Sequence, residues 1–169
     1  EKGAAAPDDS YEAWEAAGGA VETGRPETPP AGGFTLLPEK ALLATTNAVM
    51  ADLGRPSQTV IDARATPRFR GEVEPLDPVA GHIPGALNRP FGLNLEPDGR
   101  FKSAAVLKAE FETLLAGRDP ATVVHHCGSG VSAVPNVLAM EIAGLGRTAL
   151  YAGSWSEWCN TPGLPCAQG

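Results

Sequence analysis

Residues 121–133 read ATVVHHCGSGVSA, and this stretch decides the fold. The apolar run from Thr122 predicts a buried β-strand, and the apolar spacing from Val131 onward predicts a helix. A Gly/Ser loop separates the two, and it begins with Cys127. Ligands of parallel sheets bind beyond the carboxyl ends of the strands. We therefore expect an α/β fold whose functional site lies at Cys127.

The rest of the chain alternates between helix and strand patterns. Proline opens the first helix and glycine ends it, as is typical of helix boundaries. Strands that alternate with helices predict a parallel sheet of about five strands with helices on both faces. The expected elements are a helix at 38–53, a strand at 59–63, a weaker strand at 85–89, a helix at 103–116, a strand at 148–151 and a short helix at 154–159.

The first 33 residues do not have the pattern of a domain. Residues 24–33 (GRPETPPAGG) are typical of an extended linker. Residues 11–17 predict a short amphipathic turn that carries Trp14, with nothing nearby to bury it. We expect residues 1–33 to be the tail of a preceding domain plus an interdomain linker, and residues 34–169 to form a second domain.

Composition narrows the classes of function. The chain has 169 residues, is 43% hydrophobic and carries a formal charge of −7, which disfavours a nucleic-acid partner. No apolar run approaches the roughly 18 residues needed to cross a bilayer, and no signal-peptide pattern is present, so no membrane partner is expected. Three cysteines form no disulfide framework in a chain of this length, which favours a reducing compartment. We expect a cytoplasmic protein.

The loop after the strand suits sulfur chemistry. Its glycines let it wrap tightly, so that several backbone N–H groups can point at one sulfur. The helix N-terminus adds positive potential, and together these features favour the thiolate form of Cys127. A sulfur atom transferred to that thiolate would remain anionic and be held by the same donors. The predicted persulfide-binding loop consists of Gly128, Ser129, Gly130, Val131 and Ser132.

Structural roles are the alternative for the other reactive residues. Cys127 itself could be a small apolar core residue, and Cys159 and Cys166 are expected to be structural or incidental. His125 and His126 are adjacent in a strand and point to opposite faces, so they cannot chelate one ion together. We predict no metal site and no cofactor.

Three further expectations concern charged, aromatic and phosphate-binding residues. We expect Asp62 and Arg64 to form an ion pair or loop clamp, His82 to make structural hydrogen bonds, and Trp155 and Trp158 to pack the last helix on the sheet. Cysteine phosphatases use Cys-x5-Arg, but Ala133 stands in the arginine position. The sequence therefore excludes a phosphatase.

Five motifs together resemble a known family. They resemble the C-terminal, catalytic domain of tandem-rhodanese sulfurtransferases, specifically the 3-mercaptopyruvate sulfurtransferase type, and the match covers residues 35–165. Residues 11–24 resemble the end of the family's N-terminal domain, whose bulk is absent from this chain. In chain order the motifs are VIDAR at 60–64, Arg68-Phe69, GHIPGA at 81–86, CGSGVS at 127–132 and YAGSWSEW at 151–158.

The resemblance implies a rhodanese-like fold and a sulfurtransferase. Cys127 would take sulfur from a small-molecule donor, become a persulfide and pass the outer sulfur to a thiol acceptor. The missing N-terminal rhodanese domain is the implied protein partner, so the chain is expected to be a fragment or one half of a split enzyme. A non-catalytic rhodanese-like interaction module is the alternative from another class.

The loop and one arginine bear on the donor. Relatives that use thiosulfate carry basic residues after the cysteine, whereas Gly128 and Ser129 are uncharged, which resembles the mercaptopyruvate branch. Arg68 matches a family arginine that binds the donor's carboxylate, and a guanidinium fork suits that role. Leu76 stands where the family has a second arginine. We expect 3-mercaptopyruvate as the donor, with thiosulfate as the alternative.

Overall fold

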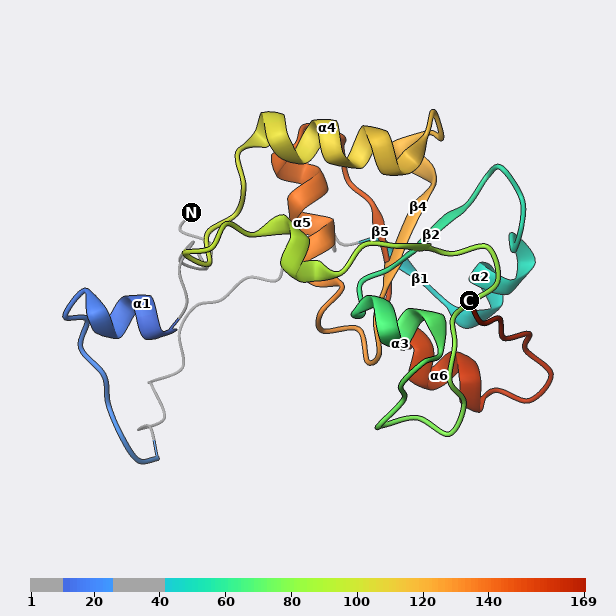
Figure 1. The fold of residues 1–169 in the computed structure, drawn as a ribbon, viewed down its shortest axis with the longest axis horizontal. Coiled ribbons are helices and arrows are strands. Elements are labelled where there is room, and N and C mark those ends of the chain that lie inside the picture. The colour runs from blue at the N-terminus through green and yellow to red at the C-terminus, as the bar shows by residue number, and fades with distance from the viewer. Residues whose placement is uncertain (1–10, 26–41) are drawn as a thin grey trace, which may run out of the picture.

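The structure, a computed structural model, describes residues 11–25 and 42–169 (Figure 1). In chain order its elements are α1 (Tyr11–Ala16), β1 (Leu42–Ala44), α2 (Thr46–Ala51), β2 (Thr59–Asp62), α3 (Thr66–Arg70), β3 (Leu87–Asn88), the 3-10 helix η1 (Phe91–Asn94), α4 (Ala104–Leu115), the 3-10 helix η2 (Pro120–Thr122), β4 (Val123–His126), α5 (Val134–Ile142), β5 (Ala149–Tyr151) and α6 (Ser154–Asn160).

The five strands of the described residues form one parallel sheet, in the order β1-β5-β4-β2-β3. The central strand β4 lies in register with β2, so that His126 is opposite Asp62. Cys127 follows β4 directly and therefore lies at the middle of the sheet's carboxyl edge. The predicted α/β fold with a parallel sheet of about five strands is confirmed.

The two faces of the sheet are covered by different helices (Figure 1). Alternate residues of a strand point to opposite faces. Ile61 and Val123 pack under α4 and α5, whereas Val60 and Val124 pack under α2 and α6. Trp155 and Trp158 are fully buried in the second cluster, which confirms that they pack the last helix on the sheet. The expected helices on both faces are therefore present.

The helix predicted over residues 38–53 is wrong in its first part. Residues 42–44 form β1, which pairs in parallel with β5, and helix α2 covers only Thr46–Ala51 after the N-cap residue Thr45. Residues 38–41 lie outside the described residues. Leucine and alanine favour helices in isolation, but pairing with an exposed sheet edge satisfies the backbone of β1 and overrides that preference.

The helix after the loop begins later than predicted. The apolar spacing predicts a start at Val131, but α5 starts at Val134 with a proline in its first turn. Residues 131–133 form a turn that extends the loop from Cys127.

In the first part of the chain, Trp14 of α1 is 51% exposed, as expected for a turn with nothing nearby to bury it. Within the described ranges, no helix is both long and apolar enough to cross a membrane.

Candidate active site

Cys127 is fixed at the carboxyl end of β4 by hydrogen bonds to the start of α6. Its backbone N–H donates to Ser154 Oγ at 3.1 Å, and its carbonyl accepts from the backbone N–H of Trp155 at 3.0 Å. Ser154 has a φ of +56° and is fully buried, and its hydroxyl donates to the carbonyl of Tyr151 at 2.9 Å. The sequence analysis did not identify Ser154, because no local pattern indicates that a serine at the start of α6 accepts a hydrogen bond from the residue after β4.

The backbone N–H groups of the loop make no hydrogen bonds to the described part of the fold. From Gly128 to Ala133, none of these groups has a recorded acceptor among the described residues. Gly130 has a φ of +84°, and a Cβ there would lie 2.5 Å from the carbonyl oxygen of Ala152. Glycine is therefore required at this position for the loop to pack against the segment after β5.

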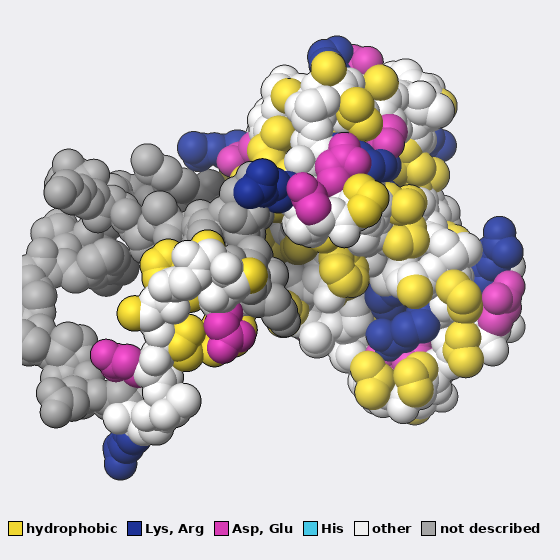
Figure 2. Space-filling model, turned by 60° about the vertical axis from the view of Figure 1, so that its left-hand side comes forward, with side chains coloured by type: hydrophobic (Ala, Val, Ile, Leu, Met, Phe, Trp, Pro, Cys, Tyr) yellow, Lys and Arg dark blue, Asp and Glu magenta, His cyan; other side chains and the backbone are white. Residues whose placement is uncertain are grey.

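A cavity of about 350 Å³ opens beside this loop and brings together most of the predicted site residues. Gly130 and Val131 do not line it, and the side chain of Val131 is 73% exposed. Figure 2 shows hydrophobic side chains exposed among charged ones on one face of the molecule. Leu76 and Phe91 are exposed hydrophobic residues that line the cavity. The lining residues are Ala63, Arg64, Ala65, Arg68, Leu76, Asp77, Phe91, Cys127, Gly128, Ser129, Ser132 and Ser156.

Arg68 reaches the cavity from α3 and is held by two carboxylates. Its Nη2 lies 2.6 Å from Glu74 Oε1 and 3.4 Å from Asp77 Oδ2. Its Nη1 has no recorded acceptor within the described part of the chain and faces Gly128, where a Cβ would lie 3.4 Å away. Its Nε is buried without a partner. One side of the guanidinium is therefore engaged, and the other faces the loop.

A buried ion-pair network connects Arg68 to Arg64 through Glu74. Arg64 Nη2 lies 2.6 Å from Asp62 Oδ2, and its Nη1 lies 3.3 Å from Glu74 Oε2, which confirms the predicted Asp62–Arg64 pair. Burial alone would raise the pKa of Glu74, but hydrogen bonds from Arg68 and from two backbone N–H groups outweigh it and hold the pKa below its ordinary value. Glu74 is therefore a fixed anion that links both arginines.

The three histidines lie in structural positions. His125 and His126 are fully buried on opposite faces of β4, near Met140 and Tyr151 respectively. Burial lowers the pKa of His125 to about 3, and burial also lowers the pKa of His126 despite the nearby carboxylate of Asp62. Both are neutral at pH 7. His82 stacks on Phe69 and its Nδ1 lies 2.7 Å from that residue's carbonyl oxygen.

Neither the other two cysteines nor any cluster of possible metal ligands forms a second reactive site among the described residues. Cys159 and Cys166 are free thiols, and burial raises the pKa of each. Among the described residues, no group of three or more His, Cys, Asp or Glu side chains is arranged to hold a metal ion.

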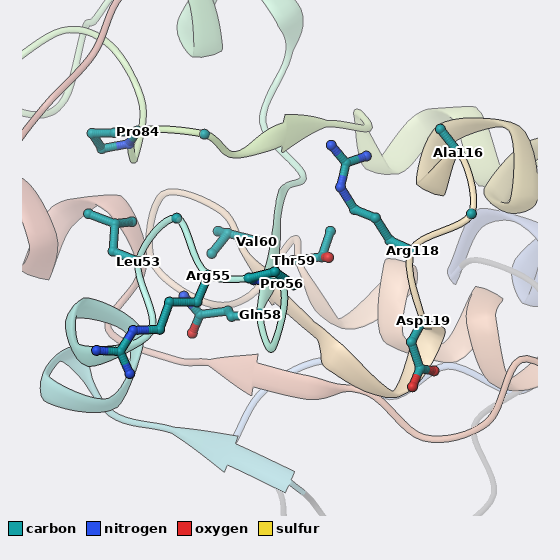
Figure 3. A pocket seen from close by; sticks show the side chains of 13 residues that line it. Leu53, Arg55, Pro56, Gln58, Thr59, Val60, Pro84, Ala116, Arg118 and Asp119 are labelled. Atoms are coloured by element: carbon teal, nitrogen blue, oxygen red, sulfur yellow. The ribbon is translucent and has the colours of Figure 1, made fainter.

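A larger cavity, of about 650 Å³, lies at the other end of the sheet, where β2 and β4 begin (Figure 3). Its polar side chains already bind within the fold: Gln58 Nε2 donates to the carbonyl of Val49 at 2.9 Å, and Arg118 Nη1 donates to that of Leu115 at 3.1 Å. No cysteine or histidine lines this cavity. The cavity beside Cys127 is therefore the better candidate for an active site.

Comparison with known proteins places the chain in one family. The family model of the rhodanese-like domain matches residues 45–161. A Pseudomonas aeruginosa protein named Probable 3-mercaptopyruvate sulfurtransferase is 48% identical over 162 residues, which are 96% of this chain and 57% of that protein. A Mycobacterium tuberculosis protein whose name includes thiosulfate sulfurtransferase SseB is 42% identical over 96% of this chain and 56% of its own length.

A solved structure is also similar to this chain. The 3-mercaptopyruvate sulfurtransferase from Leishmania major is 31% identical, with a TM-score of 0.70 over 91% of this chain and 43% of that one. The chain thus spans about half the length of the curated relatives it matches. The resemblance to the 3-mercaptopyruvate sulfurtransferase type that the five motifs predicted is confirmed, and the chain belongs to the rhodanese-like domain family.

Proposed function

We propose that this chain is the catalytic domain of a sulfurtransferase that moves sulfur from 3-mercaptopyruvate to a thiol acceptor through a persulfide on Cys127. The observation that carries the proposal is the position of Cys127 beside six consecutive backbone N–H groups that have no recorded acceptor within the described residues. Such an array stabilises negative charge on sulfur. A merely structural cysteine has no need of it.

The first half-reaction loads Cys127. Its thiolate attacks the sulfur of 3-mercaptopyruvate, an S–S bond forms and the S–C bond breaks. The electron pair leaves on carbon as the enolate of pyruvate, which takes a proton from water. The thiol proton of the donor is released to water in turn, so the outer sulfur of the persulfide is left as an anion. The loop N–H groups hold the outer sulfur, and the free side of Arg68 binds the donor's carboxylate beside Gly128.

The second half-reaction removes the outer sulfur from Cys127. The thiolate of the acceptor attacks the outer sulfur of the persulfide, and the inner S–S bond breaks. The electron pair returns to Cys127 as a thiolate, so the enzyme is regenerated with no net oxidation or reduction of the protein. The loop donors again stabilise the anionic sulfur at each stage.

Thiosulfate is the second candidate donor. Leu76, which stands where the family has a second substrate arginine, lines the cavity and is 77% exposed, so one cationic contact to a carboxylate is missing. A relative at 42% identity carries thiosulfate sulfurtransferase in its name. Because the chain spans about half the length of its relatives, we propose in addition that a preceding rhodanese domain completes the site in the whole protein.

Thiocyanate formation tests both candidates with one readout. Cyanide serves as the acceptor, and kcat/KM is measured for 3-mercaptopyruvate and for thiosulfate, with the preceding domain supplied and omitted. We expect a preference for 3-mercaptopyruvate and no turnover by Cys127→Ser. A preference for thiosulfate would favour the second donor, and turnover by Cys127→Ser equal to wild type would refute the proposed function.

A further inference from the structure

The ion-pair network around Arg64 and Arg68, next to the cavity beside Cys127, contains more carboxylates than guanidinium groups. Arg64 and Arg68 are its cations, and Asp62, Glu74 and Asp77 are the carboxylates paired with them. Both neighbouring histidines of β4 are neutral at pH 7 and add nothing to this balance. The network therefore carries one more negative than positive charge. Of its carboxylates, only that of Asp77 lines the cavity in which the proposed anionic donor would bind.

Of these carboxylates, Asp77 alone faces the cavity without a tight partner. Glu74 Oε1 accepts from Arg68 Nη2 and from the backbone N–H groups of Leu76 and Asp77, at 2.6, 3.1 and 3.2 Å. Glu74 thus holds the turn together. Asp77 lines the cavity, is only 7% exposed, and has one recorded partner, Arg68 Nη2, at 3.4 Å. Its charge can be removed while the Glu74–Arg68 pair stays in place.

We propose that Asp77 is a specificity-determining residue that selects sulfur donors by net charge. This inference rests on the proposed function. The carboxylate of Asp77 repels each additional negative charge on a donor that enters the cavity, and it also competes with the donor for Arg68. Donors with one negative charge, such as 3-mercaptopyruvate, are accepted, whereas the dianion thiosulfate meets a greater penalty.

The size of the effect follows from Coulomb's law. Thiosulfate carries one charge more than 3-mercaptopyruvate, so the two donors differ by one unit of repulsion from Asp77. For a separation of about 6 Å between the Asp77 carboxylate and the additional charge, and an effective dielectric constant of about 40, this difference corresponds to roughly a tenfold change in relative reactivity. Glu72 offers a matched control, because it is 57% exposed and pairs only loosely with Arg70, at 3.7 Å.

The experiment measures single-turnover loading of Cys127 by each donor, as the gain of one sulfur atom in the intact mass. Wild type is compared with the charge-free variants Asp77→Asn and Asp77→Ser, with the charge-conserving Asp77→Glu, and with the control Glu72→Gln. We expect the thiosulfate-to-mercaptopyruvate ratio of loading rates to rise roughly tenfold in the two charge-free variants. It should stay within twofold of wild type in Asp77→Glu and Glu72→Gln.

The outcomes separate this inference from the proposed function. If neither donor loads wild-type Cys127, the proposed function fails and the inference falls with it. If wild type loads but the ratio is unchanged in Asp77→Asn and Asp77→Ser, or rises equally in Glu72→Gln, only the selection by Asp77 is refuted. Unfolding of both charge-free variants would also overturn it, since Asp77 would then be a structural residue.

Discussion

Replacing Gly130 by alanine should disrupt the loop that holds Cys127. The new Cβ would lie 2.5 Å from the carbonyl oxygen of Ala152 and 3.1 Å from its Cα, so a backbone segment must move. The φ of +84° costs a non-glycine residue about 1–2 kcal/mol, and overpacking adds about 1–3 kcal/mol. We expect Gly130→Ala to lower the free energy of unfolding by about 2–4 kcal/mol, within the sum of those two costs.

Ala152 cannot give way easily, since it lies between β5 and the buried Ser154 that binds the backbone of Cys127. A displacement of about 1 Å at a reacting centre can cost roughly 100-fold in rate, and we expect Cys127 loading to slow by that order. The matched control is Gly128→Ala. Its Cβ would approach only side-chain atoms, the nearest being Arg68 Nη1 at 3.4 Å, so this variant should keep wild-type stability. The assay combines urea unfolding with sulfur loading. If Gly130→Ala matches wild type in both measurements, the close-approach argument is refuted.

Three further predictions concern the substrate arginine, the serine behind Cys127 and the buried histidines. Arg68→Ala should reduce kcat/KM for 3-mercaptopyruvate by about 10- to 150-fold, because it removes a charge-assisted contact to the donor, and Leu76→Arg should lower KM. Unchanged kcat and KM in both variants would mean that the donor's carboxylate binds elsewhere. Ser154→Ala leaves the N–H of Cys127 without its acceptor and should cost about 1–3 kcal/mol in urea unfolding, whereas a stability equal to wild type would show that this bond is dispensable. The folded-state pKa of His125, about 3, lies below its unfolded value, so the unfolded state binds more protons and stability is lost as pH falls below about 6.5, by about 1.4 kcal/mol per pH unit. Urea midpoints at pH 7 and pH 5 should show this slope, and His125→Phe should reduce it; an equal slope in the variant would assign the loss to other groups.

The sequence predicted the elements whose signal is local. The buried runs of β2 and β4 and the helix α4, with Ser103 as its N-cap residue, form as their patterns indicate. Strand β1 was assigned to a helix, since only its pairing with β5 makes three residues of Leu-Leu-Ala extended. Its conformation is set by a partner more than 100 positions away, which no window of local sequence contains.

Membership of the candidate cavity could be predicted only for residues that belong to a local motif. Cys127 and its loop form one contiguous motif, and the structure brings Arg68 into the same cavity. Glu74 and Asp77 lie in an irregular segment with no hydrophobic period, so nothing in the sequence indicates that both carboxylates turn toward Arg68. Their positions depend on backbone hydrogen bonds within that turn.

Intact mass after exposure to 3-mercaptopyruvate tests the central claim most directly. Wild type and Cys127→Ser are incubated with the donor and measured before and after treatment with excess thiol. The account predicts a gain of one sulfur, about 32 Da, in wild type alone, located at Cys127 and removed by the thiol. An equal gain in Cys127→Ser would contradict the account, because the sulfur would then be carried by Cys159 or Cys166 rather than by the loop after β4.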